Sequence, residues 1–379
     1  MKKSLWMLGV AVAALTSCTQ NEVVEIAENR AIEFEPFVGK QSRAADVDAN
    51  MLVGAAGATN DLTSFWVYAT YSGEDSDVTN PFDGSNNSKV YWDEDNDSFK
   101  YDNPRQWHKG TYQFGAYSNG NSKLESEVSF NATNTTFTFT DYVNSGNLDL
   151  VATIPAAIIK NEANMNAGVT LGFKHMLACI ELEFTNNSTS YFLDFQNLKF
   201  SAQSKSTCTY SPANTTAPIA WSTPSVPKEY EFITNTYVHN GTDASTNNPN
   251  VLLAPAGKAK FHCFVIPQSN SSIDLTFDIA AYTRTAQKNS DGTTDKKDAQ
   301  GNVIYDYVYN STEKYKASLA ITGEHTSWKP GILYRYTANV TGETHYITFF
   351  VQSVEGWTSA TNPSVDTTVT PAKPTNSGN

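Results

Sequence analysis

Apolar and polar residues alternate along most of this chain, the pattern of β-strands with one face in a core and one in water. In residues 64–71, positions 65, 67, 69 and 71 form one apolar face. Residues 90–101 place two aromatic arms around an acidic turn and predict a hairpin. Trp107, residues 112–117 and the pair Phe137 and Phe139 extend it into a meander. The first half therefore predicts strands joined by Asn, Asp, Gly and Ser turns.

A second and cleaner set of alternating segments follows. Ala178, Ile180, Leu182 and Phe184 share one face, while Glu181 and Glu183 take the other, which we expect in water. The same alternation recurs in residues 273–279, 332–340 and 347–351. Strands of this kind are typical of antiparallel sandwiches. The chain is thus predicted to be all-β, with two tandem antiparallel β-sandwich domains at residues 44–165 and 166–357.

Polar stretches interrupt and follow these strands. The insertions at residues 235–250 and 285–301 predict surface loops or flexible excursions. Residues 358–379 are rich in Thr, Pro and Ser and poor in apolar residues, which predicts a polar tail.

The N-terminus has the three parts of an export signal. Lys2 and Lys3 are followed by an apolar stretch at residues 5–15, too short to span a bilayer, and then by Leu15-Thr16-Ser17-Cys18. The small residues before the cysteine allow a peptidase to approach the backbone, and the sequence resembles the lipobox of bacterial lipoproteins. Residues 1–17 are therefore predicted to be a lipoprotein signal peptide and Cys18 the point of lipid attachment. A cysteine placed there by chance is the alternative.

Residues 18–43 read as a separate leader. Ala31-Ile32-Glu33-Phe34-Glu35 alternates apolar with acidic residues, which predicts a short strand with Ile32 and Phe34 on one face, limited by Pro36. The leader ends in a basic and small-residue stretch containing Arg43-Ala44, which a trypsin-like protease could enter. Cleavage there would leave the lipid on the leader rather than on the body.

Charge and cysteine count narrow the class of protein. Lys+Arg 26 against Asp+Glu 39 gives a net charge of -13, which repels nucleic acid and anionic lipid. Cys179, Cys208 and Cys263 form an odd set outside the cytoplasm, so they cannot all pair within the chain. Three half-buried thiols in strands, or one disulfide such as Cys208 with Cys263, are the open alternatives.

Catalytic and metal motifs are missing from the sequence. The six histidines are scattered, with no HxH pair or HExxH helix, and no GxSxG elbow occurs. We therefore predict no enzyme activity, no catalytic residues, no cofactor and no bound metal. The Asp93–Asp97 turn is the one candidate calcium site, although it lacks the glycine and glutamate of an EF-hand and also fits a solvated hairpin tip.

Taken in order, these features resemble a known family, the fimbrillins of Bacteroidales, which include the Mfa-like and FimA-like lipoprotein pilins of type V pili. The matching stretches are Leu15–Cys18, the leader strand with Arg43-Ala44, the hairpin ending at Trp107, Tyr112-Gln113-Phe114-Gly115-Ala116-Tyr117, Leu171-Gly172-Phe173-Lys174-His175, Trp328-Lys329-Pro330-Gly331-Ile332-Leu333-Tyr334-Arg335-Tyr336, Phe349-Phe350-Val351 and Trp357. Each is weak alone, and only the ordered set is persuasive.

The resemblance implies a structural or adhesive subunit of a cell-surface fimbria, exported to the outer membrane as a lipoprotein and built of transthyretin-like sandwiches. It also implies that Arg43 is the cleaved residue and that Ile32 and Phe34 fill a groove. After the leader is lost, a strand of a neighbouring pilin subunit takes its place, with strands near 333–351 as suppliers or neighbours of the donor. Partners are other pilin subunits and surface ligands, while stalk, tip and anchor roles stay open.

Two other functions compete with this one. A monomeric surface lipoprotein could bind glycans through exposed coplanar Trp or Tyr side chains, against the default that these rings pack in cores. A hydrolase would need two facing carboxylates in a cleft, and the sequence singles out no such pair.

Overall fold

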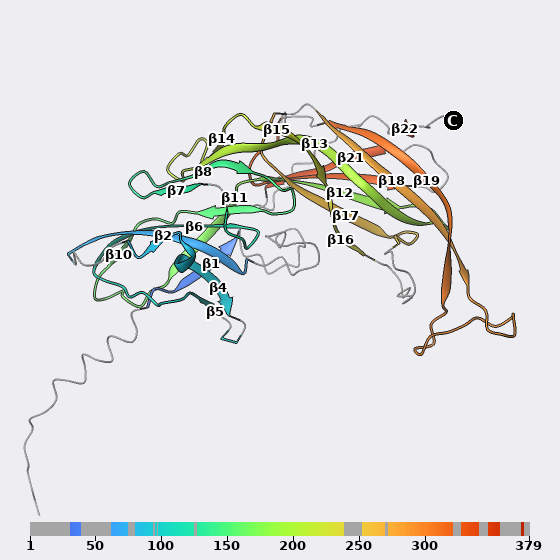
Figure 1. Ribbon diagram of the computed structural model, residues 1–379, viewed down its shortest axis with the longest axis horizontal. Coiled ribbons are helices and arrows are strands. Elements are labelled where there is room, and N and C mark those ends of the chain that lie inside the picture. The colour runs from blue at the N-terminus through green and yellow to red at the C-terminus, as the bar shows by residue number, and fades with distance from the viewer. Residues whose placement is uncertain are drawn as a thin grey trace, which may run out of the picture.

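A computed structural model of the protein describes residues 31–38, 62–74, 80–93, 95–96, 98–124, 127–238, 252–269, 272–320, 327–340, 348–356 and 373–374. Within these residues the regular elements are strands, apart from one short 3-10 turn at Asn86–Ser88, and they form three sheets (Figure 1). The all-β prediction is confirmed. No helix in these ranges is long and apolar enough to cross a membrane.

The first sheet has nine strands and is built mostly from the first half of the chain. Its order is β1 (Phe34–Val38), β11 (Val169–His175), β9 (Leu150–Thr153), β6 (Gly110–Asn119), β2 (Ser64–Gly73), β4 (Lys89–Asp93) and β5 (Ser98–Lys100), with β10 (Ile158–Lys160) on β6 and β3 (Phe82–Asp83) on β2. The predicted hairpin is present, since β4 and β5 pair antiparallel with Trp92 opposite Phe99.

Two further sheets contain the remaining described strands, which come from the second half of the chain apart from β7, β8 and β12. The eight-stranded sheet runs β22 (Lys373–Pro374), β19 (Tyr305–Ala320), β18 (Ser272–Ala286), β13 (Phe192–Tyr210), β8 (Thr136–Val143) and β7 (Val128–Asn131), with β14 (Ile219–Trp221) and β15 (Ser225–Glu231) also on β13. The five-stranded sheet runs β16 (Ile233–Val238), β17 (Lys258–Val265), β12 (Ala178–Asn186), β20 (Ile332–Val340) and β21 (Thr348–Gly356). The tail is thus not wholly outside the fold, because β22 belongs to it.

Two strand pairs differ from the expected antiparallel arrangement. β1 lies parallel to β11, and β12 lies parallel to β20 along eight residue pairs. A parallel pair needs a long crossover connection, and the described chain between β12 and β20 provides one by building seven other strands, β13 to β19.

The largest core lies between the five-stranded and eight-stranded sheets. The predicted apolar faces meet there, with Ile180, Leu182 and Phe184 from β12 against Leu275 and Phe277 from β18. A second core lies within the curved nine-stranded sheet and includes Phe65, Val67 and Phe114. A third core joins the other face of that sheet to β7, β8 and the far end of β13, so that Trp66 is buried against Tyr117 rather than facing water.

The long strand β13 takes part in two of these cores. Its first residues, such as Phe195 and Phe200, belong to the core between the second and third sheets, and Cys208 and Tyr210 belong to the core under the first. Strands from either side of residue 165 also share sheets: β7 and β8 join the eight-stranded sheet, and β11 joins the nine-stranded one. The domain boundary predicted at residue 165 stays a prediction.

The expected water-facing position of Glu181 and Glu183 is wrong. Their exposed fractions are only 1% and 7%. Glu181 contacts Arg335 Nε at 2.5 Å and Lys260 Nζ at 3.4 Å, and Glu183 contacts Lys258 Nζ at 2.7 Å. A buried carboxylate is tolerated when cations pair with it, and the register of β17 and β20 beside β12 supplies these partners.

Candidate functional site

The leader strand occupies the edge of the nine-stranded sheet. The sequence predicted a strand at residues 31–35 that Pro36 would limit, whereas β1 begins at Phe34 and continues past Pro36 to Val38. Proline is tolerated because β1 is the last strand of its sheet, and an edge strand can lack a backbone donor. Its register places Phe34 opposite Val169 and Val38 opposite Phe173.

Phe34 fills an aromatic pocket beneath β1. Its ring lies edge-on to four rings, at centroid distances of 5.4 Å to Phe82, 5.8 Å to Tyr101 and 6.1 Å to both Phe65 and Phe114. Only 5% of Phe34 is exposed. Such edge-to-face pairs add to the free energy gained by burying the ring.

Ile32 lies just before β1 and bonds to the segment that follows β5, at the other end of the sheet. It is 1% exposed, its N–H donates to Arg105 O at 2.9 Å, and its carbonyl accepts from the Tyr101 hydroxyl at 2.9 Å. The neighbouring Ala31 forms a bridge with Gln106. The leader therefore bonds to β11 on one side and to the segment after β5 on the other, closing the gap between the two ends of a curved sheet.

A buried lysine holds the wall of this groove. Lys160 Nζ lies 3.9 Å from the centre of the Trp107 ring and donates to the carbonyl oxygens of Asn164 at 2.9 Å and Ala167 at 2.5 Å. Burial lowers the pKa of its ammonium group. These bonds fix the loop that leads into β11. The strand that pairs with β1 is therefore held in place by contacts that do not involve β1.

The geometry makes β1 separable from the rest of the fold. β1 is the terminal strand in the order of the described sheet, so the loss of β1 would leave the pairings among β11, β9 and β6 in place. Loss would expose the pocket of Ile32 and Phe34, each contributing roughly 1.5–3 kcal/mol by burial, together with the backbone edge of β11. Such a groove can accept another strand.

The other predicted processing residues are placed only by sequence. Cys18, Arg43 and Ala44 lie outside the described residues. Arg43 falls between the end of β1 at Val38 and the start of β2 at Ser64. A cut at this arginine would therefore separate β1 covalently from every other strand, leaving it held by pairing and packing alone.

In the candidate calcium turn, the carboxylate of Asp93 is bound by neighbouring side chains. Asp93 accepts hydrogen bonds from Asn96 Nδ2 at 2.5 Å and Lys100 Nζ at 2.7 Å, and these two side chains lower the pKa of its carboxyl group. Glu94 and Asp97 lie outside the described residues. Within the part of the chain that the structure describes, no three His, Cys, Asp or Glu side chains gather as metal ligands.

The three cysteines of the body are free. Cys179, Cys208 and Cys263 are each 0% exposed, so they are fully rather than half buried, and the alternative of a Cys208–Cys263 disulfide is wrong. Burial raises the pKa of all three thiols.

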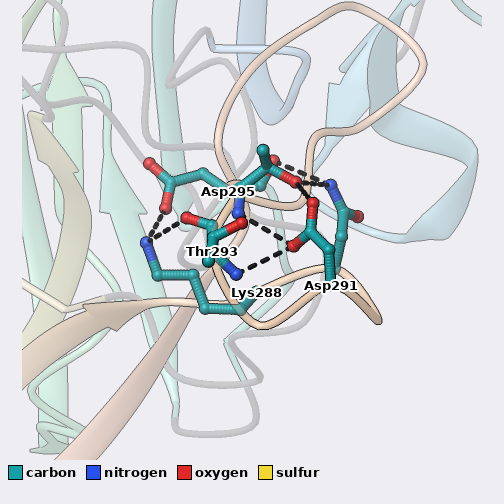
Figure 2. Close-up of polar contacts among 6 residues, drawn as sticks. Lys288, Asp291, Thr293 and Asp295 are labelled. Atoms are coloured by element: carbon teal, nitrogen blue, oxygen red, sulfur yellow. Dashed lines mark hydrogen bonds and ion pairs between the residues drawn. The ribbon is translucent and has the colours of Figure 1, made fainter.

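The insertion expected to be a loop or a flexible excursion forms the organised tip of an arm. Asp291 accepts from the N–H groups of Thr293 and Thr294 at 2.8 and 2.9 Å and from the Thr294 hydroxyl, and Lys288 pairs with Asp295 at 2.5 Å (Figure 2). The side-chain hydroxyl of Thr294 and the two backbone groups lower the pKa of Asp291 to about 2. Sequence reasoning missed this arm, although the spacing Tyr305-x-Tyr307-x-Tyr309 signals a strand.

Comparison with known proteins finds similar solved structures but no family assignment. No protein-family model and no curated protein matches the chain. Solved structures that resemble it include a candidate cell adhesion protein from Bacteroides uniformis, 14% identical, with TM-score 0.43 over 87% of this chain and 98% of that one. A second, from Bacteroides ovatus, is 13% identical, with TM-score 0.40 over 88% and 99%.

The fimbrial anchor protein Mfa2 from Porphyromonas gingivalis is also similar, with 8% identity and TM-score 0.29 over 86% of this chain and 98% of that one. These solved structures are described as two candidate cell adhesion proteins and a fimbrial anchor protein.

Proposed function

We propose that this chain is a subunit of a bacterial cell-surface fimbria, exported as a lipoprotein through Cys18 and assembled by strand exchange. The leader is cut after Arg43, β1 leaves its groove, and a strand of a neighbouring subunit replaces it. The observation that carries this proposal is the position of β1, an edge strand whose Ile32 and Phe34 side chains complete a core that the rest of the sheet leaves open.

The free energy of the strand exchange depends on the groups that the empty groove exposes. An emptied groove exposes aromatic rings and the unpaired backbone groups of β11, and both are satisfied by any strand that presents apolar side chains at alternate positions. Exchange is favoured when the incoming strand buries more apolar surface than the two side chains of the leader. The precursor is thereby kept from polymerising while its own leader occupies the site.

The test is mass spectrometry of the protein recovered from the cell surface, in the wild type and in two variants. We expect assembled material that begins at Ala44 and a lipidated precursor that begins at Cys18. Arg43→Ala is expected to accumulate as lipidated, unassembled precursor, and Lys40→Ala, a matched control three residues away, is expected to process normally. Recovery of assembled surface protein that retains the whole leader would contradict the proposal.

A monomeric glycan-binding lipoprotein is the second candidate, and one observation favours it. Four tyrosines, Tyr282, Tyr305, Tyr307 and Tyr309, share one face of the arm. That candidate keeps its leader for life, so the mass of the mature N-terminus separates it from a polymerising subunit.

A further inference from the structure

The arm is a two-stranded ribbon that leaves the body of the protein. β13 pairs with β18 only as far as Phe192 opposite Tyr282, and beyond that point β18 and β19 pair with each other alone. The ribbon extends away from the three sheets to its tip (Figure 1). An isolated ribbon is marginally stable in water, so the ordered tip around Asp291 and the contacts at its base hold it in shape.

A bulge decides which side chains the arm presents. The pairing passes from Ala281 opposite Ser311 to Tyr282 opposite Tyr309, which leaves Asn310 without an opposite residue. On the body side of the bulge, at residues 311–319, odd-numbered residues of β19 such as Tyr315 face the core. On the arm side, at residues 305–309, the alternation is reversed, because the one extra residue shifts the facing of the side chains.

The reversal gathers the tyrosines on the outer face of the sheet. Tyr309 pairs with Tyr282, Tyr307 with Arg284, and Tyr305 with Ala286, and directly opposed residues share a face. Without the bulge, the three tyrosines of β19 would point to the inner face, away from Tyr282 and Arg284.

The rings of this face are held in fixed positions. The Arg284 guanidinium lies 4.2 Å from the ring centre of Tyr305 and 5.0 Å from that of Phe192. Phe192 meets Tyr307 edge-on at 5.2 Å, and Tyr282 meets Tyr309 edge-on at 5.8 Å. Phe192 is buried beneath them, whereas Tyr309 is 57% exposed. The face is therefore pre-organised and needs little ordering to bind a ligand.

The chemistry of the face selects the class of ligand. It offers aromatic rings, phenol hydroxyls and one guanidinium, and its small apolar members are alanines rather than the aliphatic side chains that fill protein interfaces. Residues 282–309 carry four basic side chains, at 284, 288, 296 and 297, and four acidic ones, at 291, 295, 298 and 306, so their charges cancel within a chain of net charge -13.

We propose that the outer face of the arm, formed by Tyr282, Arg284, Tyr305, Tyr307 and Tyr309 over the buried Phe192, binds an extended neutral glycan. Sugar rings present C–H faces that stack on aromatic rings and hydroxyl edges that pair with phenol and guanidinium groups. Residues 305 to 309 span about 13 Å of strand, which suits a chain of several sugars. An acidic glycan is disfavoured because the negative charge of the whole protein repels it.

Affinity electrophoresis of the full chain in gels that contain mannan, xyloglucan or starch tests this inference, with polygalacturonate as the acidic probe. We expect retardation by at least one neutral polysaccharide and none by polygalacturonate. Tyr309→Ala and Tyr307→Ala should each weaken binding about three- to tenfold, and Tyr309→Phe should retain it, because the ring is kept. Val308→Ala, exposed on the opposite face, is the matched control and should bind as the wild type does.

Three results would overturn the inference: no retardation of the wild type by any neutral polysaccharide, full binding by the Tyr307→Ala/Tyr309→Ala protein, or a tyrosine-dependent dimer in sedimentation, which would assign the face to a second copy. Equal melting temperatures for the variants exclude a folding defect as the cause of lost binding.

The inference rests on the proposed surface role but fails separately from it. A wild type that assembles without binding glycan removes the inference alone, and one that binds without assembling removes the fimbrial proposal alone.

Discussion

Glu181 and Arg335 form an ion pair across the parallel strands β12 and β20, with Arg335 Nε 2.5 Å from the glutamate Oε1 and 1% of the glutamate side chain exposed. Lys260 approaches the same carboxylate at 3.4 Å from β17. One buried charge is thus shared by three neighbouring strands, on the face of the sheet opposite the main core.

This arrangement predicts a large asymmetry between single and double substitutions. Arg335→Leu should lower the free energy of unfolding by about 3 kcal/mol, because it leaves a buried carboxylate short of its closest cation. Adding Glu181→Leu should restore most of that loss. Lys258→Leu, whose side chain is 56% exposed, should cost less than about 1 kcal/mol. Urea titrations of the four proteins measure these differences, and an Arg335→Leu protein as stable as the wild type would refute them.

Phe34→Ala should loosen the leader strand without unfolding the body. Removing a ring surrounded by four others costs about 3–5 kcal/mol of docking free energy. Hydrogen exchange should then accelerate at the backbone amides of residues 169–173, which face β1. The control is Glu33→Ala, an exposed neighbour, which should leave exchange unchanged. Unaltered protection of β11 in Phe34→Ala would show that the ring does not hold the strand.

His262 should make the protein less stable in acid. It is 4% exposed, its Nδ1 has no hydrogen-bond partner in the described structure, and burial lowers its pKa to about 4. Between pH 6.5 and 4 the unfolded chain binds a proton that the folded chain does not, so stability rises with pH across this window. The stability lost on acidification is about 3 kcal/mol.

The check is to compare unfolding curves of the wild type and His262→Gln from pH 7 to pH 4. The difference between the two proteins should shrink or change sign as the pH falls, because only the wild type must exclude a proton at this position. Parallel pH profiles would show that His262 titrates normally in the folded state.

The thiols should be silent in the folded protein. Cys179, Cys208 and Cys263 are buried, and burial raises the pKa of each, so little thiolate is present for reaction. Titration of the body with Ellman's reagent should detect no fast-reacting thiol in buffer and three in denaturant without reductant. A count of one in denaturant would reveal a disulfide.

Asp291→Ala should disorder the tip of the arm and leave the cores intact. Its carboxylate accepts hydrogen bonds from the N–H groups of Thr293 and Thr294, and no other described side chain accepts from both of them. We expect faster proteolytic cleavage at Lys288, Lys296 or Lys297 with an unchanged melting temperature. Asp291→Asn keeps one acceptor oxygen and should be cleaved at an intermediate rate. Equal cleavage rates for all three proteins would place the order of the tip elsewhere.

The strands could be predicted from sequence because their alternation is a local property. The apolar faces of β12 and β18 and the hairpin of β4 and β5 were read directly from neighbouring residues. Partners distant in the chain were not readable. The local pattern predicts that Glu181 faces water, because no residue near it in sequence indicates its ion pair with Arg335. That arginine lies 154 positions away in the chain.

The same limit applies to the candidate sites. Ile32 and Phe34 were singled out by alternation, but the continuation of β1 through Pro36 depends on its place at the edge of a sheet, which local sequence does not encode. The tyrosines of the arm were overlooked because the bulge at Asn310 reverses their facing, and a single unpaired residue has no signature in the pattern of apolar positions.

The 19-residue strand β13 passes unbroken from the core between the second and third sheets to the core beneath the first. A load applied to one half of the molecule is consequently carried into the other by a continuous backbone, with no linker to stretch in between. If the chain assembles into a fimbria as proposed, this strand would transmit tension between the two halves without a hinge between them.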